Sequence, residues 1–370
     1  DIFDHLYRRT GYRMRLDTQV SAATRLEVVT EGVLTRLLHA DPALEGVAAV
    51  IFDEFHERSL QADLGLALCL DARAQLGAEF RVLVMSATLD GARVARLLGD
   101  APVITSEGRA HPVETRYLGR TQARIEDDMA AAIMRALREE TGSILAFLPG
   151  QGEIFRVAER LTERVDATSV DVDPLYGALD MAAQDRAVLP APSGRRKVVL
   201  ATAIAETSLT IEGVRVVIDS GLARVPRFEP DVGISRLETV RVSRASADQR
   251  RGRAGRTGPG ICYRLWDEPE TQGLVPFAEP EIKAADLTGL VLDCAEWGAS
   301  DPRALAWLDP PPEGLVRSAQ QDLAALGALD TDGHITAEGR KLRSLPLPPR
   351  LARMLVASVQ HGACRRAAMI

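Results

Sequence analysis

An unbroken apolar run that ends in two acidic residues constrains the fold of this chain more than any other feature. Residues 47–52 read Val-Ala-Ala-Val-Ile-Phe, and Asp53 and Glu54 follow directly. A run without polar alternation predicts a parallel strand buried on both faces. In open α/β sheets the ligand crevice lies outside the carboxyl ends of the strands, where carboxylates hold a Mg²⁺–nucleotide and orient an attacking water. Taken alone, an acidic pair in a solvated loop is the commoner explanation.

A second cluster, far downstream, is rich in arginine. Six arginines and one acid lie between Arg241 and Arg256. If residues 246–256 form a helix, Gln249, Arg253 and Arg256 share one face. Gly252 and Gly255 cost helix stability but leave room for a close approach of backbone or phosphate. A solvated basic helix is the alternative, but the choice of arginine over lysine favours fork-like recognition of phosphate oxygens.

Six segments spread along the chain occur in a recognisable order. They are Thr30-Glu31-Gly32, Asp53 to His56 (Asp-Glu-Phe-His), Ser86-Ala87-Thr88, and residues 144–150, 201–213 and 249–256. In this order they resemble motifs Ib, II, III, IV, V and VI of the DEAH-box branch of superfamily 2 helicases. Within this branch they resemble the bacterial HrpB-type helicases, whose motif II commonly reads Asp-Glu-Phe-His, as it does here.

The resemblance implies roles for the residues of motifs II and VI. It implies that Asp53 holds Mg²⁺ through its water shell and that Glu54 orients the attacking water of ATP hydrolysis. Arg253 and Arg256 are then arginine fingers on the γ-phosphate, and Gln249 helps to place the water. Phosphoryl transfer needs positioning and charge neutralisation more than covalent chemistry, which suits this set.

The resemblance also assigns residues that couple the nucleotide to the lobe interface. His56, Ser86 and Thr88 are implied in this coupling, and Ser208 in motif V is implied at the ATP site. A histidine that only satisfies structural hydrogen bonds is an equally weighted alternative for His56.

Single-stranded nucleic acid, RNA by resemblance, is expected to contact motifs Ib and V. Thr30 and Gly32 lie where a strand gives way to a helix, so main-chain N–H groups there can bind phosphate. Thr202 takes the matching place in the second lobe. The chain has Ala203 and Glu212 where many DEAH-box proteins carry Asn and Asp, which puts the contacts at those two positions in doubt.

One motif is missing from these 370 residues, because no G-x-x-x-x-G-K-[ST] segment occurs. We interpret the chain as an internal fragment of a longer protein, and as given it is expected to be inactive. The rival interpretation is a natural loss of the phosphate-binding loop. Two function classes therefore stay open: an ATP-dependent RNA helicase, and a non-hydrolysing module that binds nucleic acid or a protein partner.

Composition excludes several other classes. The net charge is −7, from 45 Lys and Arg against 52 Asp and Glu, so nucleic acid must be bound through local patches. The four cysteines form no C-x-x-C pair, so neither a zinc site nor a disulfide framework is indicated. The chain has no apolar run of about 18 residues, so we expect no membrane span and a cytoplasmic location.

Strand and helix patterns alternate in the way that produces parallel sheets. The first block has strands near 26–30, 47–52, 81–86 and 102–105 and helices near 31–40, 59–77 and 90–98. The second has strands near 113–118, 143–148, 197–201, 214–219 and 261–266. A hairpin over 223–243 interrupts it. Further on we expect helices over 279–298 and 315–329 and a hairpin at Asp332-Gly333.

By resemblance this α/β chain comprises two RecA-like lobes, a winged-helix domain and the start of a helical bundle. The expected bounds are 1–110 for the first lobe, which is incomplete, and 111–270 for the second. The winged-helix domain is expected over 271–345, packed mainly on the lobes, and the bundle from 346 to 370.

Overall fold

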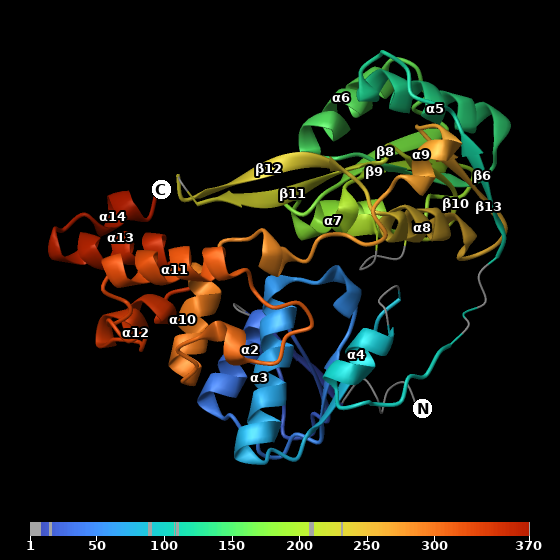
Figure 1. Ribbon diagram of the computed structural model, residues 1–370. Helices are drawn as coiled ribbons and strands as arrows, with labels where there is room; N and C mark the ends of the chain where they lie inside the picture. The colour runs from blue at the N-terminus through green and yellow to red at the C-terminus, as the bar shows by residue number, and fades with distance from the viewer. Residues whose placement is uncertain are drawn as a thin grey trace. The chain divides into compact units, whose positions relative to one another are not determined.

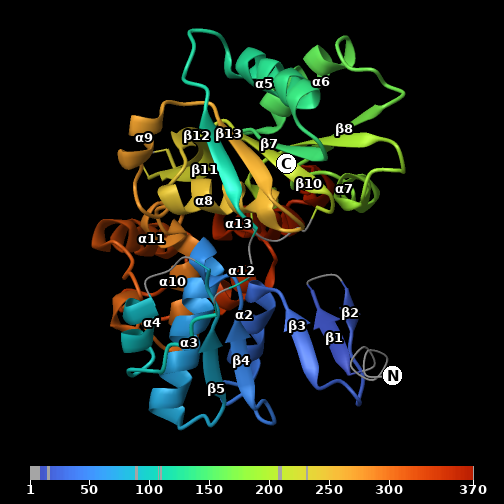
Figure 2. The same ribbon diagram turned by 90° about the vertical axis from the view of Figure 1, so that its right-hand side faces the viewer.

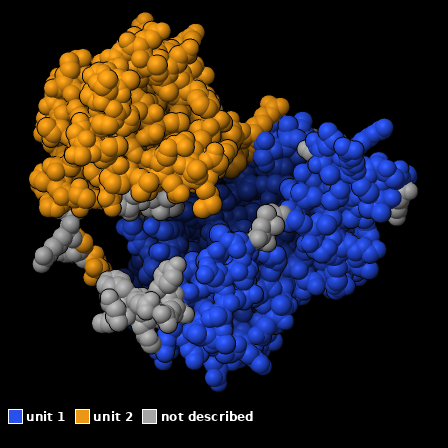
Figure 3. All heavy atoms as spheres, turned by 180° about the vertical axis from the view of Figure 1, so that it is seen from behind, with its two compact units in different colours: residues 1–104, 228–235, 279–370 blue, residues 105–227, 236–278 orange. Residues whose placement is uncertain are grey.

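The computed structural model describes residues 9–14, 17–87, 91–106, 108, 111–206, 211–230 and 232–369. The chain forms two compact units, which Figure 3 shows in different colours. The first unit contains residues 1–104, 228–235 and 279–370, and the second contains residues 105–227 and 236–278.

The second unit is built on a six-stranded parallel sheet in the order β6-β13-β10-β7-β9-β8. Every residue of its central strand β7 is buried. Alternate residues of β7 enter two separate apolar clusters, so both faces of the sheet are covered. The strands are β6 (Val113–Tyr117), β7 (Ser143–Phe147), β8 (Val170–Leu175), β9 (Arg196–Ala201), β10 (Val214–Asp219) and β13 (Gly260–Arg264).

Helices lie on both faces of this sheet (Figure 1). Helices α5 and α6 pack on one face and α7 and α8 lie on the other. The helices are α5 (Ile125–Glu139), α6 (Gln151–Thr162), α7 (Met181–Val188), α8 (Arg244–Gly252) and α9 (Glu268–Gln272), with the short 3₁₀ helices η2 (Ala203–Ala205) and η3 (Arg253–Gly255). The predicted strands of this region are confirmed, while β8 was not predicted.

The first unit contains two smaller sheets (Figure 2). Strands β4 (Ala49–Phe52) and β5 (Arg81–Val84) form a parallel pair. Strand β1 (Thr10–Arg13) lies between β2 (Thr18–Gln19) and β3 (Leu26–Val29). Along β4, Val50 and Phe52 are buried, whereas Ile51 is 49% exposed. The prediction that this strand is buried on both faces is therefore wrong in this structure, because only one face of the β4–β5 pair is packed.

Helices α2 (Glu31–Ala40) and α3 (Leu60–Leu76) cover the packed face of β4 and β5. Ser59 starts α3 by accepting the Ala62 N–H, and Gly77 ends it with a φ of 66°. These bounds confirm the predicted helices, as does α4 (Gly91–Leu97). The strand predicted over 102–105 does not form. Residues 102–105 have no regular secondary structure, and the side chain of Ile104 is 91% exposed.

The C-terminal part of the chain is helical and shares its apolar core with α2 and α3. It comprises α10 (Thr288–Trp297), α11 (Glu313–Ala325), α12 (Ala337–Ser344), α13 (Pro349–Gln360) and α14 (Cys364–Ala367), with η4 (Glu281–Lys283) and η5 (Pro302–Ala304). An antiparallel bridge between Leu329 and Ile335 confirms the hairpin at Asp332-Gly333. The helix predicted over 279–298 is shorter, because η4 and an irregular turn precede Thr288.

Strands β11 (Leu222–Glu229) and β12 (Ile234–Arg241) form the predicted hairpin. Residues 228–235 at its tip belong to the first unit. There the Phe228 N–H donates to the Ala284 carbonyl at 2.9 Å, and Arg350 Nη1 donates to the Gly233 carbonyl at 3.0 Å. Among the described residues, each helix is too short or too polar to cross a membrane.

Candidate active site

The acidic pair lies at the carboxyl end of β4, as the sequence predicts. The Glu54 N–H donates to Asp53 Oδ1 at 2.8 Å, and Glu54 takes a left-handed conformation with φ of 49°. This conformation is uncommon for a residue with a side chain, and it turns the chain sharply after the strand. Asp53 is exposed and Glu54 is partly exposed. Both carboxylates are therefore accessible to a ligand beyond the end of the strand.

The residue after the pair anchors the loop to the neighbouring strand. Phe55 is buried, and its N–H donates to the Met85 carbonyl at 3.0 Å. The Met85 N–H donates in turn to the Phe52 carbonyl at 2.7 Å. The 3₁₀ helix η1 (Phe55–Glu57) follows. These bonds hold the motif II loop against the end of β5, where motif III begins.

His56 contacts both motif II and motif III. Its Nδ1 lies 3.4 Å from Glu54 Oε2 and 3.4 Å from the Ala87 N–H nitrogen, which donates to it. One nitrogen cannot accept from Ala87 and donate to Glu54 at once, so the two contacts belong to different protonation states or tautomers. The structure thus brings His56 to Glu54 and to the chain next to exposed Ser86, while Thr88 lies outside the described residues.

The arginine cluster does not form the single helix expected over 246–256. Helix α8 ends at Gly252 and the 3₁₀ helix η3 follows, so the regular spacing of Gln249, Arg253 and Arg256 is broken. Arg253 is buried, and its Nε donates to the main-chain carbonyl of Glu206 at 2.6 Å. Arg256 is exposed just after η3, and Gln249 is partly buried on α8.

The two glycines of the cluster differ in how closely neighbouring atoms approach them. A Cβ on Gly255 would lie 2.7 Å from the His111 carbonyl oxygen, so this glycine allows a close approach of backbone, as predicted. A Cβ on Gly252 would meet no atom within 4 Å. The steric explanation therefore applies to Gly255 alone within the folded unit.

Sequence reasoning missed Arg250, whose side chain is fully buried. Its Nε donates to Glu206 Oε1 at 2.7 Å, and its Nη1 donates to Asp219 Oδ1 at 2.8 Å. The guanidinium carbon also lies 4.9 Å from the centroid of the Phe147 ring. Arg250 therefore joins motif V to motif VI inside the second unit. In a run of arginines, nothing in the sequence marks which one is buried.

The residues predicted to contact nucleic acid lie at the starts of two helices of different kinds. Thr30 is the N-cap of α2, and both Thr30 and Gly32 are exposed there. Thr202 precedes the 3₁₀ helix η2, and its N–H donates to the Leu175 carbonyl at 3.1 Å. Ser208 lies outside the described residues.

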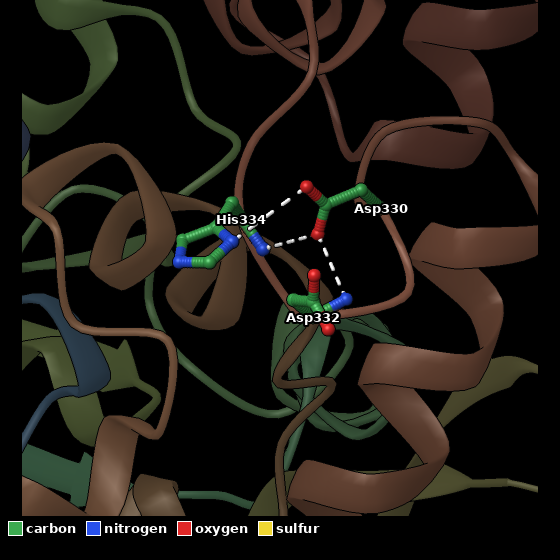
Figure 4. Close-up of side chains that lie close together, drawn as sticks. All are labelled: Asp330, Asp332 and His334. Carbon is green, nitrogen blue, oxygen red and sulfur yellow. Dashed lines mark hydrogen bonds and ion pairs between the residues drawn. The ribbon is translucent and has the colours of Figure 1, made fainter.

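Asp53 is the predicted position for Mg²⁺, and its surroundings suit that ion. It offers an exposed carboxylate beside a second one, and hard cations of this kind prefer oxygen ligands and retained waters. A separate group of potential metal ligands, Asp330, Asp332 and His334, lies in the hairpin turn after α11 (Figure 4). There Asp330 Oδ1 accepts the N–H groups of Asp332 and His334 at 3.0 and 2.8 Å, so this carboxylate shapes the turn.

Comparison with known proteins identifies two domain families in the chain. Residues 128–258 match the helicase conserved C-terminal domain, and residues 319–347 match the winged-helix part of the helicase associated domain, HA2. The first match covers most of the six-stranded sheet, and the second covers the hairpin turn and α12.

Curated relatives align with nearly the whole chain. It is 51% identical over 361 residues to the ATP-dependent RNA helicase HrpB of Escherichia coli K12, covering 97% of this chain and 44% of that protein. It is 38% identical over 359 residues to the pre-mRNA-splicing factor ATP-dependent RNA helicase prp22 of Schizosaccharomyces pombe, covering 95% of this chain and 31% of that protein. The chain thus spans less than half the length of either relative.

Solved structures agree with these relatives. The crystal structure of the Escherichia coli DEAH/RHA helicase HrpB superposes with a TM-score of 0.90 at 51% identity, covering 98% of this chain and 46% of that one. The crystal structure of the E. coli DExH-box NTPase HrpB gives a TM-score of 0.86 at 51% identity, with 97% and 44% coverage.

Proposed function

Because the chain belongs to the HrpB-type DEAH-box helicases, we propose that it carries most of the motor of an ATP-dependent RNA helicase. The observation that supports this most directly is the presence of two motifs in one chain: an exposed acidic pair at a strand end, and an arginine cluster at the end of α8. In this motor the first lobe would span residues 1–110, the second lobe 111–270, the winged-helix domain 271–345 and the start of the helical bundle 346–370. We also propose a cytoplasmic location.

ATP with Mg²⁺ would supply the phosphoryl group and the charge neutralisation for hydrolysis. In the proposed site Asp53 would hold the ion, through its water shell as the resemblance implies, and Glu54 would orient the attacking water. When its Nδ1 carries the proton, His56 would steady the Glu54 carboxylate by donating to it. Arg253 and Arg256 neutralise charge that develops on the γ-phosphate, and Arg253 must then exchange its bond to the Glu206 carbonyl for a phosphate oxygen.

Single-stranded RNA is the proposed track for this motor. Thr30 and Gly32 lie at the start of α2, where main-chain N–H groups can bind phosphate oxygens. The Thr202 N–H is already bonded to the Leu175 carbonyl, so Thr202 would contact phosphate through its hydroxyl group. Contacts of this kind carry no sequence information and weaken as salt rises. The proposal therefore predicts sequence-independent binding with a steep salt dependence.

A non-hydrolysing binding module is the second candidate, because these 370 residues contain no phosphate-binding loop. The two candidates differ in ATP turnover by the protein that the complete gene encodes. RNA-stimulated turnover supports the helicase, and its absence supports the binding module. In either case the 370-residue chain by itself is expected to turn over no ATP.

Glu54→Gln in the complete protein tests the assigned chemistry. The substitution keeps size and hydrogen-bonding shape but removes the charge that polarises water, so ATP binding should persist while turnover collapses. Glu57→Gln makes the same change at an exposed position three residues away and should leave turnover near wild type. Near-normal turnover of Glu54→Gln would remove Glu54 from the mechanism.

Arg256→Ala tests the proposed role of the arginine cluster. Loss of a γ-phosphate contact made mainly in the transition state should lower kcat by roughly a thousandfold. Arg244→Ala, an exposed arginine at the start of α8, serves as the control and should change kcat little. Equal effects of the two substitutions would show that Arg256 acts only through general surface charge.

A further inference from the structure

A buried arginine closes the motif II loop. Arg58 is 5% exposed, although arginine side chains are rarely buried without partners. Its Nε and Nη2 donate to the two carboxylate oxygens of Asp63 at 3.1 and 3.0 Å. Its Nη1 donates to Asp309 Oδ2 at 2.7 Å. Asp63 belongs to the adjacent helix α3, but Asp309 comes from the far C-terminal part of the chain.

Asp309 is placed by a stiff segment. It directly precedes three consecutive prolines, residues 310–312, whose fixed φ angles restrict the chain before α11. Its carboxylate is mostly buried and gathers three cations: Arg58 at 2.7 Å, Arg93 at 3.0 Å and Lys283 at 3.5 Å. Through Asp309, therefore, the C-terminal region forms ion pairs with Arg58 of the motif II loop and with Arg93.

The charges of this cluster depend on one another. Burial would raise the pKa of Asp309, but hydrogen bonds from Arg58 and Arg93 outweigh it and hold that pKa below its usual value. Burial raises the pKa of Asp63 in spite of its bonds to Arg58. Asp309 is thus the carboxylate more firmly ionised beside the guanidinium, and its loss would leave a buried charge that only Asp63 compensates.

The C-terminal region also contacts the main chain around Arg58. The Glu281 N–H donates to the Arg58 carbonyl at 3.2 Å, and Glu281 Oε2 accepts the Leu60 N–H at 2.8 Å. Arg58 itself has a φ of 51°, a left-handed conformation that external contacts must maintain. The C-terminal region therefore holds both the backbone and the side chain of this residue.

A short hydrogen-bonded path leads from Arg58 to Glu54. The Arg58 N–H donates to the Phe55 carbonyl at 3.2 Å, and the Glu57 N–H donates to the Glu54 carbonyl at 2.9 Å. The Arg58 guanidinium carbon also lies 5.8 Å from the centroid of the buried Phe55 ring. A shift of Arg58 must therefore move the 3₁₀ turn that carries Glu54 and His56.

We propose that Asp309 is a positioning residue for ATP hydrolysis: through Arg58 it holds the motif II turn in the geometry in which Glu54 orients the attacking water. The C-terminal region thereby contributes to a reaction whose atoms it does not touch. The inference rests on the proposed role of Glu54, but the contact between Asp309 and the turn stands independently of that role.

A matched control separates positioning from stability. Asp293 on α10 is also a mostly buried carboxylate, and its Oδ1 accepts from Arg343 Nε of α12 at 2.6 Å. Both residues of this pair lie in the C-terminal region, and His39 of α2 lies 3.8 Å away. Asp293→Asn should therefore weaken the same region without disturbing the motif II turn.

The test compares Asp309→Asn with Asp293→Asn in the protein that the complete gene encodes. Asp309→Asn should lower kcat for ATP by about ten- to hundredfold, with KM for ATP within about twofold of wild type. Asp293→Asn should leave kcat within about twofold. Hydrogen exchange of the main chain over residues 53–58, measured well below the melting temperature, should accelerate about tenfold in Asp309→Asn alone.

Arg58→Lys provides the second variant if Asp309→Asn does not fold. It keeps the positive charge but loses the fork that meets both carboxylates, so kcat should fall again with KM preserved. The inference is overturned if folded Asp309→Asn or Arg58→Lys has wild-type kcat and exchange, or if Asp293→Asn lowers kcat equally. If the wild-type protein hydrolyses no ATP, the proposed function fails. The hydrogen exchange of residues 53–58 in Asp309→Asn then tests by itself whether Asp309 holds the motif II turn.

Discussion

Similar apolar strands are buried to different extents in the two units. Ile144 of β7 and Ile51 of β4 are both isoleucines in parallel strands, yet Ile144 is fully buried and Ile51 is half exposed. Strand β7 has a neighbour on each side and helices on both faces, whereas among the described strands β4 pairs only with β5. An apolar run therefore indicates that a strand can be buried on both faces, and its neighbours decide whether it is.

The difference extends beyond one residue. Several apolar side chains of the first unit's strands and their ends are between 41% and 57% exposed: Leu26, Val28, Val47, Ile51, Leu83 and Met85. The corresponding strands β7, β9 and β10 of the second unit keep nearly all their apolar side chains buried. Stability should consequently be concentrated in the second unit, which four measurements can test.

The largest effect is expected at Arg250. Arg250→Leu removes the partner of two carboxylates, Glu206 and Asp219, inside the second unit. Breaking a buried pair in this way costs about 3–5 kcal/mol in free energy of unfolding. Denaturant unfolding should show the loss in the second unit. Arg251→Leu, a partly exposed neighbour, should cost less than about 1 kcal/mol, and equal costs would contradict the structural role of Arg250.

The paired substitutions Ile144→Ala and Ile51→Ala compare the sheets directly. Removing the buried side chain of Ile144 leaves a cavity and should cost about 3 kcal/mol in free energy of unfolding. The half-exposed Ile51 loses less apolar burial, so its substitution should cost no more than about 1 kcal/mol. Urea unfolding of the two variants measures both costs. Similar values would mean that the exposed face of β4 is covered in solution.

Hydrogen exchange tests the same contrast without substitution. The amides of β7 and β9 should exchange about a hundredfold more slowly than those of β4 and β5, because the second sheet opens only with its whole unit. Mass spectrometry of peptides from each strand measures the ratio. Equal protection in the two sheets would break the comparison.

The smallest effect concerns pH. Burial, with a smaller contribution from the charge of Arg343, lowers the pKa of the His39 imidazole to about 4, against about 6.5 when unfolded. The unfolded state therefore binds the proton first, and stability present above pH 6.5 is lost as pH falls towards 4. Between pH 6.5 and 5 the first unit should lose about 2 kcal/mol through this group, and His39→Leu should abolish that part of the slope. An unchanged slope would exclude His39 as its source.

Sequence patterns predicted the second unit's strands well because long apolar runs allow few alternatives. They missed β8, where Asp171, Asp173 and Pro174 interrupt the apolar pattern. A strand at the edge of the sheet tolerates such residues because one side of it makes no ladder bonds. The strand predicted over 102–105 failed for the opposite reason: its residues suit a strand, but they join none of the sheets that the described residues form.

The candidate site was predictable where it depends on motifs and unpredictable where it depends on long-range contacts. The acidic pair after β4 and the close approach at Gly255 followed from local pattern and residue size. The burial of Arg250 and the bond from Arg58 to Asp309 join positions that no local pattern connects. The break in α8 at Gly252 was likewise missed, because helical spacing was extended through two glycines.

The division of the chain between the units has a consequence for how the gene can be dissected. The boundaries lie at 104/105, 227/228, 235/236 and 278/279, so the first unit is assembled from three separate stretches. No single truncation yields that unit intact: stopping at residue 104 discards the helices that complete its core, and starting at residue 279 discards its strands. Deletions at either end of these 370 residues would therefore disrupt the same unit, and coexpression of two pieces is the more informative design.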